Sequence, residues 1–168
     1  MTHAEPPAVL TAQELALALA GNVRVIGRQV AGLSHADSLL QPPVRGNCLN
    51  WVLGHIAVHR DFILEALGAP QVLGNAARER YDRESEPILE DEPGVIALGS
   101  LLSALDQTQE RIEGILCQSK AADLARKVSE ADSTSVARFV SFLYWHETYH
   151  VGQTELLRQL AGTDDKVI

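Results

Sequence analysis

The sequence predicts an all-α protein, a four-helix bundle with long crossover connections. Four long segments repeat their apolar residues at steps of three and four, which is the period of one helix face, and no segment alternates as a half-buried strand does. Amphipathic helices of this length commonly pack as a bundle. The chain has 168 residues, the length of one ordinary domain, so residues 1–168 are expected to form a single domain.

The first two helices have recognisable start and stop signals. Thr11 and Glu14 have the spacing of a capping box, in which each side chain accepts a hydrogen bond from the other residue's backbone amide, so the first helix is expected to begin there. It is expected to end before Pro42-Pro43, because proline cannot continue a helix, and a short connection follows. The second helix is expected over residues 48–67, because Gly68 is well suited to end it.

The third and fourth helices follow longer connections. The third is expected to start near Pro93, a residue that fits the first turn of a helix. The fourth is expected over residues 134–161, with Ser133 as its N-terminal cap and Gly162 at its end. The two long connections are residues 69–92 and 118–133, with short helices predicted near 75–81 and 121–127.

Composition and charge exclude several classes of partner. Apolar residues make up 46% of the chain and charged residues 21%, which is typical of a folded soluble protein. The formal net charge is −8 and no cluster of Lys or Arg occurs, so neither nucleic acid nor an anionic membrane is expected as a partner. The apolar residues 15–20 follow acidic residues, unlike a secretion signal. The protein is therefore expected to be cytoplasmic, with Cys48 and Cys117 as reduced core thiols.

Two pairs of histidines lie where the helices should face the bundle interior. His55 and His59 are four residues apart on the second helix, and His146 and His150 are four apart on the fourth, so each pair shares one face. Both pairs continue apolar stripes. A dry core would have to satisfy every ring nitrogen of these imidazoles, whereas a bound metal ion takes up their lone pairs directly. The pattern therefore predicts a metal site.

Two known metal motifs overlap these histidines, and both fit poorly. His146–His150 reads H-E-x-x-H, the helix of many zinc proteases, in which Glu147 would be the general base. Such a protease needs a third ligand downstream, and Glu155 is only one turn beyond His150. A di-iron bundle needs two Glu-x-x-His pairs, and the chain has one.

What remains is a site of three histidines from two helices. His146 and His150 supply two ligands, and one of His55 and His59 supplies the third. Three protein ligands with an open coordination position are typical of a catalytic metal site, whereas structural sites are closed. Imidazole ligands accept zinc and nickel alike, so the identity of the metal stays open between them.

Two segments of the chain also carry a family resemblance. NWVLGHI, residues 50–56, is similar to a single-histidine motif at the start of a second helix, and WHETYHVGQ, residues 145–153, is similar to an H-x-x-x-H-x-G-Q motif on a fourth helix. In this order and at a separation of about 90 residues, the two motifs resemble those of the DinB/YfiT-like superfamily of metal-dependent helical bundles. Together with the four-helix pattern, the resemblance covers essentially the whole chain.

The resemblance implies a divalent metal ion, zinc or nickel, held by His55, His146 and His150 in a pocket toward one end of the bundle. It also implies a homodimer and a small-molecule substrate. Characterised relatives include transferases and isomerases that use a low-molecular-weight thiol such as bacillithiol or mycothiol, so a metal-dependent thiol transferase or hydrolase is expected. The alternative is a non-catalytic bundle that binds a metal or small molecule, or that dimerises.

The roles of several neighbouring residues stay open at this point. His59 lies outside the family motif, and four roles are open for it. It is either a fourth metal ligand, a hydrogen-bond partner of a ligand, an ordinary core residue, or the catalytic general base that carries protons. Gln153 either orients a metal ligand or serves only in the packing of the helix. Core positions are expected for Trp51 and Trp145, one of which could form the wall of a pocket. Glu147 and Tyr149 are expected to point away from the site, and surface positions are expected for His3 and His35.

Overall fold

The computed structural model describes residues 10–131 and 133–163, and His3 lies outside them. The described residues form helices and contain no strand, only an isolated bridge between Lys127 and Ser135. The long helices are α1 (Ala12–Gln29), α3 (Leu49–Ala66), α5 (Leu98–Leu116) and α7 (Val136–Arg158). The short helices are α2 (His35–Ser38), α4 (Asn75–Tyr81), α6 (Ala121–Ala125) and the 3-10 helix η1 (Gln159–Ala161). The all-α prediction is confirmed.

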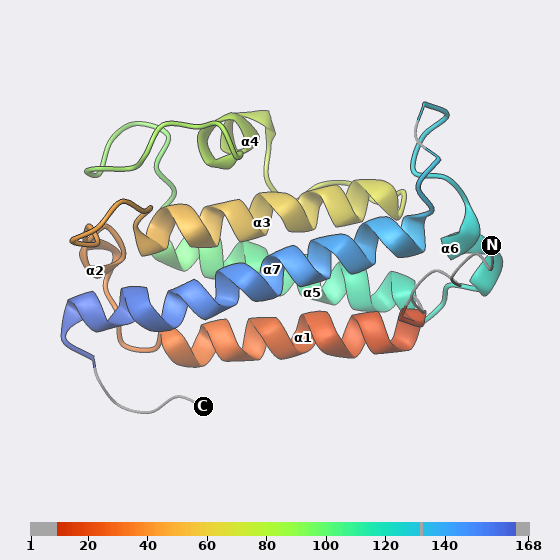
Figure 1. The fold of residues 1–168 in the computed structure, drawn as a ribbon, viewed down its shortest axis with the longest axis horizontal. Coiled ribbons are helices and arrows are strands. Elements are labelled where there is room, and N and C mark those ends of the chain that lie inside the picture. Colours follow the sequence, from red (N-terminus) through yellow and green to blue (C-terminus); the bar gives the residue numbers. More distant parts are fainter. Residues whose placement is uncertain (1–9, 132, 164–168) are drawn as a thin grey trace, which may run out of the picture.

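The long helices pack side by side into a bundle (Figure 1). Each long helix contacts two others. Helix α1 packs against α5 and α7, and α3 packs against the same two helices. The chain runs along α1 and α7 in one direction and along α3 and α5 in the other (Figure 1). The connection from α3 to α5 therefore returns along the whole bundle, carrying α4 with it, which is the long crossover that the sequence predicted.

The helix starts follow local hydrogen bonding. At α1 the amide of Glu14 donates to Thr11 Oγ1 at 3.2 Å and the amide of Thr11 donates to Glu14 Oε2 at 2.8 Å, so the predicted capping box is confirmed. At α7 the cap is Ser135, whose Oγ accepts the amide of Arg138, and the prediction of Ser133 was wrong by two residues. The predicted short helix at residues 75–81 coincides with α4.

Two helix boundaries differ from the prediction for backbone reasons. Helix α1 ends at Gln29, because Gly32 adopts a φ of +80° and Ser34 then caps α2, so the connection to α3 is longer than expected. Helix α5 begins at Leu98, five residues after Pro93. Gly94 has a φ of +96°, which turns the chain out of the helical path before α5 can start.

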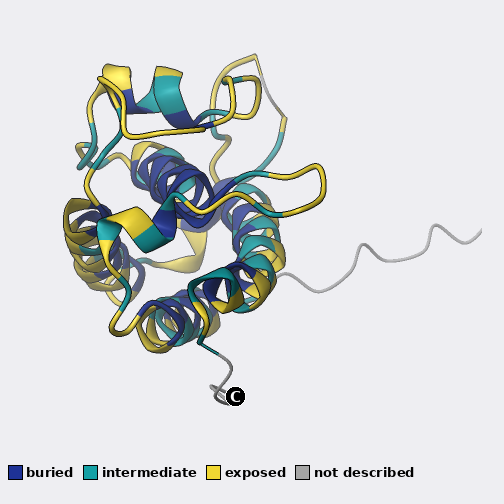
Figure 2. Cartoon of the chain, turned by 90° about the vertical axis from the view of Figure 1, so that its left-hand side faces the viewer, coloured by how far each residue is buried: buried dark blue, intermediate teal, exposed yellow. Residues whose placement is uncertain are grey.

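The core consists of two apolar clusters along the bundle. Buried residues lie on the inner faces of the long helices and exposed residues on their outer faces (Figure 2). One cluster includes Leu15, Leu19, Ile63, Leu64, Ile112 and Val140, and the other Ile26, Leu53, Ile56, Leu101 and Val151. Cys48 is buried as predicted, but Cys117 is exposed, because it follows the last turn of α5 where the apolar face has ended. No described helix is both long and apolar enough to cross a lipid bilayer.

Candidate metal centre

Three of the predicted histidines converge between α3 and α7. His55 comes from α3, and His146 and His150 come from successive turns of α7. Each offers one ring nitrogen, and the three nitrogens lie within 4.8 Å of one another. The Nε2 atoms of His146 and His150 are 3.2 Å apart. Two nitrogens bound to one tetrahedral zinc ion, each about 2.0–2.1 Å from it, would be roughly 3.3 Å apart. The arrangement therefore fits a first-row divalent ion.

The orientation of His55 is set by a backbone carbonyl. Its Nδ1 lies 2.7 Å from the carbonyl oxygen of Tyr81, and the side chain is 2% exposed. A carbonyl oxygen only accepts hydrogen bonds, so Nδ1 carries the proton and Nε2 keeps its lone pair. The free lone pair of His55 is thus the one available to a metal ion.

His150 is oriented in the same way by a side chain of its own helix. Its Nδ1 lies 2.7 Å from Oε1 of Gln153, and an amide oxygen also accepts only. Of the two roles open for Gln153, the structure supports the orientation of a ligand. His146 differs, since its buried Nδ1 has no hydrogen-bond partner among the described residues. Such outer hydrogen bonds fix the tautomer of a ligand and raise its basicity.

Tyr81 is itself held by three contacts, so the carbonyl that it offers to His55 is rigidly placed. Its hydroxyl donates to Oδ1 of Asn50 at 2.9 Å and accepts the amide of Ile96 at 2.7 Å. Its ring lies against Gly54, where the Cβ of any other residue would overlap the ring. A glycine next to His55 is therefore required for Tyr81 to approach α3.

The imidazoles are neutral at neutral pH. Burial lowers the pKa of His55 to about 4, and burial, with His150 next to it, also lowers the pKa of His146. Burial lowers the pKa of His150 as well, against the opposing effect of its hydrogen bond to Gln153. Metal ions bind neutral imidazole, so the site is in its ligand form without first losing protons.

His59 lies beside the three-histidine group but outside it. Its ring stacks on that of His146 with centroids 4.4 Å apart, and lies 4.2 Å from that of His55. Neither ring nitrogen of His59 has a partner among the described residues, and burial lowers its pKa to about 3. The prediction that His59 is a catalytic residue is not decided by these contacts and stays a prediction.

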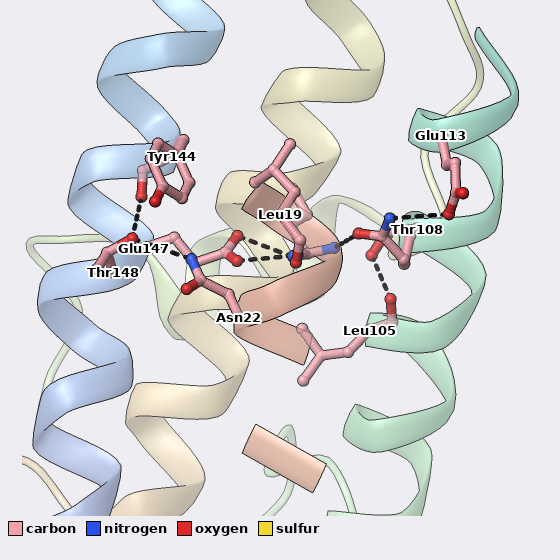
Figure 3. A network of polar contacts seen from close by, with 10 residues as sticks. Leu19, Asn22, Leu105, Thr108, Glu113, Tyr144, Glu147 and Thr148 are labelled. Carbon is pink, nitrogen blue, oxygen red and sulfur yellow. Dashed lines mark hydrogen bonds and ion pairs between the residues drawn. The ribbon is translucent and has the colours of Figure 1, made fainter. Parts of the chain in front are cut away.

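A buried ion pair lies one position beyond these histidines on both helices. Arg60 is fully buried and donates to both carboxylate oxygens of Glu147, at 2.7 and 2.8 Å. Arg60 also donates to the carbonyl of Leu19 on α1 and to Gln109 on α5, so the network joins the four long helices (Figure 3). Glu147 is therefore bound between helices, and it belongs neither to the histidine group nor to the pocket lining, in line with the expectation that it points away from the site.

A pocket of about 500 Å³ opens onto the three histidines. Trp51 forms part of its wall and stacks on His55 with ring centroids 4.6 Å apart, so it is both a core residue and a pocket residue. A larger hollow of about 880 Å³ lies elsewhere, against α5 and α6, but none of the described histidines or cysteines lines it. We therefore assign the candidate site to the smaller pocket.

The expectation of a core position for Trp145 was wrong. Trp145 is 63% exposed, because it lies on the outer face of α7, where its ring packs against that of Phe142. His35 is partly exposed, and its Nδ1 accepts the first amide of α5, from Leu98, at 3.2 Å. Tyr149, expected to point away from the site, is largely exposed yet lines the rim of the pocket.

Sequence reasoning missed Tyr81 and Arg60. Nothing in the sequence marks the backbone carbonyl of Tyr81 as a partner of His55. Arg60 had a usable signal, since it is a charged residue in the middle of a helix whose residues are mostly apolar. A buried arginine requires a buried carboxylate, and Glu147 occupies the matching position on α7.

The fold and the histidine cluster define a helical bundle with a candidate three-histidine metal site at a pocket. The sequence profile of the DinB superfamily matches residues 23–154. The chain belongs to this superfamily, as the two motifs predicted. Among curated proteins no sequence matches the chain.

Proposed function

We propose that this protein binds one divalent metal ion, zinc or nickel, through His55, His146 and His150 and uses it to activate a small-molecule thiol or water. The observation that carries the proposal is the position of three neutral imidazoles at a pocket of about 500 Å³. A pocket of this size takes a small molecule. Of the activities that DinB-like relatives suggest, thiol transfer is the one we favour.

A divalent ion in this site would lower the pKa of a coordinated thiol or water, so that a thiolate or hydroxide is present at neutral pH. The protein's own contribution is to present the ligands. The Tyr81 carbonyl and the Gln153 amide oxygen hold the Nδ1 protons of His55 and His150, so that the Nε2 lone pairs stay free. Trp51 stacks on His55 and closes one side of the pocket.

Proton transfer is the least constrained part of the proposal. Among the residues that the structure describes, no carboxylate lines the pocket, and His59 does not line it either. With a pKa of about 3, His59 is a weak base at neutral pH. We therefore propose that the thiol proton leaves to water in the pocket, and we retain His59 as a separate candidate for carrying it.

The lack of a carboxylate among the described lining residues also favours the second candidate, a non-catalytic bundle that binds a metal or a small molecule. The homodimer that the family resemblance implies remains a prediction. Phe142 and Trp145, exposed side by side on α7, give that helix an apolar outer face.

Elemental analysis of tag-free protein tests the metal site. We expect about one metal ion per chain in the wild type and in His59→Ala, and strong loss in His55→Ala, His146→Ala and His150→Ala. His35→Ala is the matched control, since His35 lies outside the site and should leave the metal content unchanged. Wild-type protein that neither contains zinc or nickel nor takes up either ion when it is added would contradict the proposal.

Cobalt substitution then separates the two functions. A thiol that binds at the open position should produce a sulfur-to-cobalt absorption band in the wild type, and the band should be missing in His150→Ala. A cobalt spectrum that does not respond to any thiol, together with no conjugation of electrophiles, would favour the non-catalytic bundle.

A further inference from the structure

The pocket above the three histidines has a charge opposite to that of the whole protein. The chain carries a formal net charge of −8. Among the residues that the structure describes, the pocket lining includes Arg45 and Arg83 and no aspartate or glutamate. Two positive charges therefore border the pocket that leads to the histidines. A divalent ion held by the histidines would add further positive charge.

The two arginines come from separate loops at one end of the bundle. Arg45 lies between α2 and α3, and Arg83 follows α4, and both loops lie near the start of α3 (Figure 1). Both residues are exposed, and neither guanidinium has an ion-pair partner among the residues that the structure describes. In contrast, Arg60, Arg78 and Arg80 each have a carboxylate partner.

The acidic residues nearest to Arg83 in the chain do not line the histidine pocket, although the Asp82 carboxylate opposes the lowering of the His55 pKa. Asp82 accepts the backbone amide of Arg83 at 2.7 Å. Asp82, together with Glu79 and Glu84, lines a neighbouring hollow, which Arg83 also borders, but none of these carboxylates lines the histidine pocket. Arg83 therefore lies at the boundary between an acidic hollow and the pocket, and its guanidinium makes no ion pair with a described carboxylate.

The rest of the lining is largely apolar. Trp51, Leu157 and Leu160 form part of the wall, and more apolar than polar surface faces the pocket. An unpaired guanidinium binds carboxylates with two parallel hydrogen bonds, a geometry that selects planar anions. The lining thus combines a metal-binding end, an apolar wall and a rim that binds anions.

We propose that the ligand of this pocket is a small organic carboxylate, held at the rim by Arg45 and Arg83. The inference rests on the proposed function only for the other end of the ligand, where a thiol sulfur would reach the histidines. The carboxylate can belong to the thiol or to the molecule with which it reacts. Either source uses the same chemistry at the rim, and the two are distinguished below.

The first experiment compares two thiols on the cobalt-substituted protein. Mercaptosuccinate carries two carboxylates, and thioglycerol is a neutral thiol of similar size. From the sulfur-to-cobalt band, we expect mercaptosuccinate to bind at least about tenfold more tightly. Arg45→Gln and Arg83→Gln should each weaken its binding by roughly three- to tenfold and leave thioglycerol unchanged. Arg138→Gln, an exposed arginine in the first turn of α7, is the control of equal charge change.

The second experiment uses metal-free protein and no thiol. Calorimetry with succinate and with its neutral analogue succinamide measures binding of the carboxylate alone. We expect succinate to bind and succinamide not to bind, and the Arg45→Gln/Arg83→Gln double variant to lose succinate binding. Succinate that still binds when thioglycerol saturates the cobalt protein would assign the carboxylate to the acceptor substrate, and competition would assign it to the thiol.

The outcomes separate this inference from the proposed function. Equal binding of mercaptosuccinate and thioglycerol, or arginine variants that bind mercaptosuccinate as the wild type does, would overturn the inference while leaving thiol activation intact. If neither thiol produces a cobalt band, the proposed function fails, and the succinate experiment then tests the carboxylate inference by itself. Arginine-dependent succinate binding then supports the inference, and its absence overturns it.

Discussion

His55 of α3 bonds through Nδ1 to the backbone carbonyl of Tyr81, 26 residues further along the chain and 2.7 Å away. Tyr81 is the last residue of α4, so the crossover between α3 and α5 returns to α3 and orients a candidate metal ligand. The carbonyl determines which nitrogen of His55 is free. Tyr81 reaches this position because its ring lies on Gly54.

Gly54→Ala should damage the site through Tyr81. The added methyl group would overlap the Tyr81 ring, and the displaced carbonyl would no longer hold His55. We expect a loss of about 1–3 kcal/mol in the free energy of unfolding and roughly 10–100-fold weaker metal binding. Urea unfolding and competition with a chelator measure the two quantities.

Gly114→Ala is the matched control for this variant. Gly114 is in α5 and has no heavy atom within 4 Å of where its Cβ would lie. Replacing it should stabilise the helix by about 0.5–1 kcal/mol and leave metal binding unchanged. If Gly54→Ala behaved like Gly114→Ala, the contact between Tyr81 and Gly54 would have no role in the site.

Gln153 should affect metal affinity much more than stability. Gln153→Leu removes the acceptor from Nδ1 of His150, and we expect roughly 10–100-fold weaker metal binding. Gln153→Glu keeps an acceptor oxygen and should restore most of the affinity. Chelator competition measures both variants. A Gln153→Leu protein with wild-type affinity would show that Gln153 only packs.

The effects of replacing Arg60 and Glu147 on the free energy of unfolding should be strongly coupled. Glu147→Gln leaves the fully buried Arg60 without its counter-charge, so we expect a loss of about 3–5 kcal/mol in the free energy of unfolding. The double variant Arg60→Met/Glu147→Leu should recover most of that loss, since it removes both charges. Urea unfolding of the wild type, Arg60→Met, Glu147→Leu and the double variant gives the coupling energy, and additive effects of the two single variants would contradict it.

Stability of the metal-free protein should fall as the pH falls below about 6.5. The pKa of His55 is about 4 and that of His59 about 3 in the folded state, whereas an unfolded histidine titrates near 6.5. Between these values the unfolded chain binds protons that the folded chain does not, so stability rises with pH in this window. Urea unfolding at several pH values measures the slope.

Comparing His59→Leu with the wild type measures how much His59 contributes to the pH dependence of stability. The variant lacks one buried group that resists protonation, so its stability should depend less steeply on pH below about 6.5. Equal slopes for the variant and the wild type would mean that His59 is not held neutral by burial.

The local features of this protein could be predicted from the sequence because they depend on residues close together in the chain. The spacing of Thr11 and Glu14 gives the capping box, and the four-residue spacing of His146 and His150 places both on one helix face. The same reasoning placed His55 and His59 on inward stripes, and residues 75–81 in a short helix.

Only the tertiary structure decided which groups meet across the bundle. Helix periodicity specifies a face, but the rotation and axial shift of one helix against another depend on the packing of both. That packing brings His55 into the group with His146 and His150, leaves His59 beside it, and turns Trp145 outward. The Tyr81 carbonyl could not be found from residue types, because every residue has the same backbone acceptor, and only the fold determines which one faces His55.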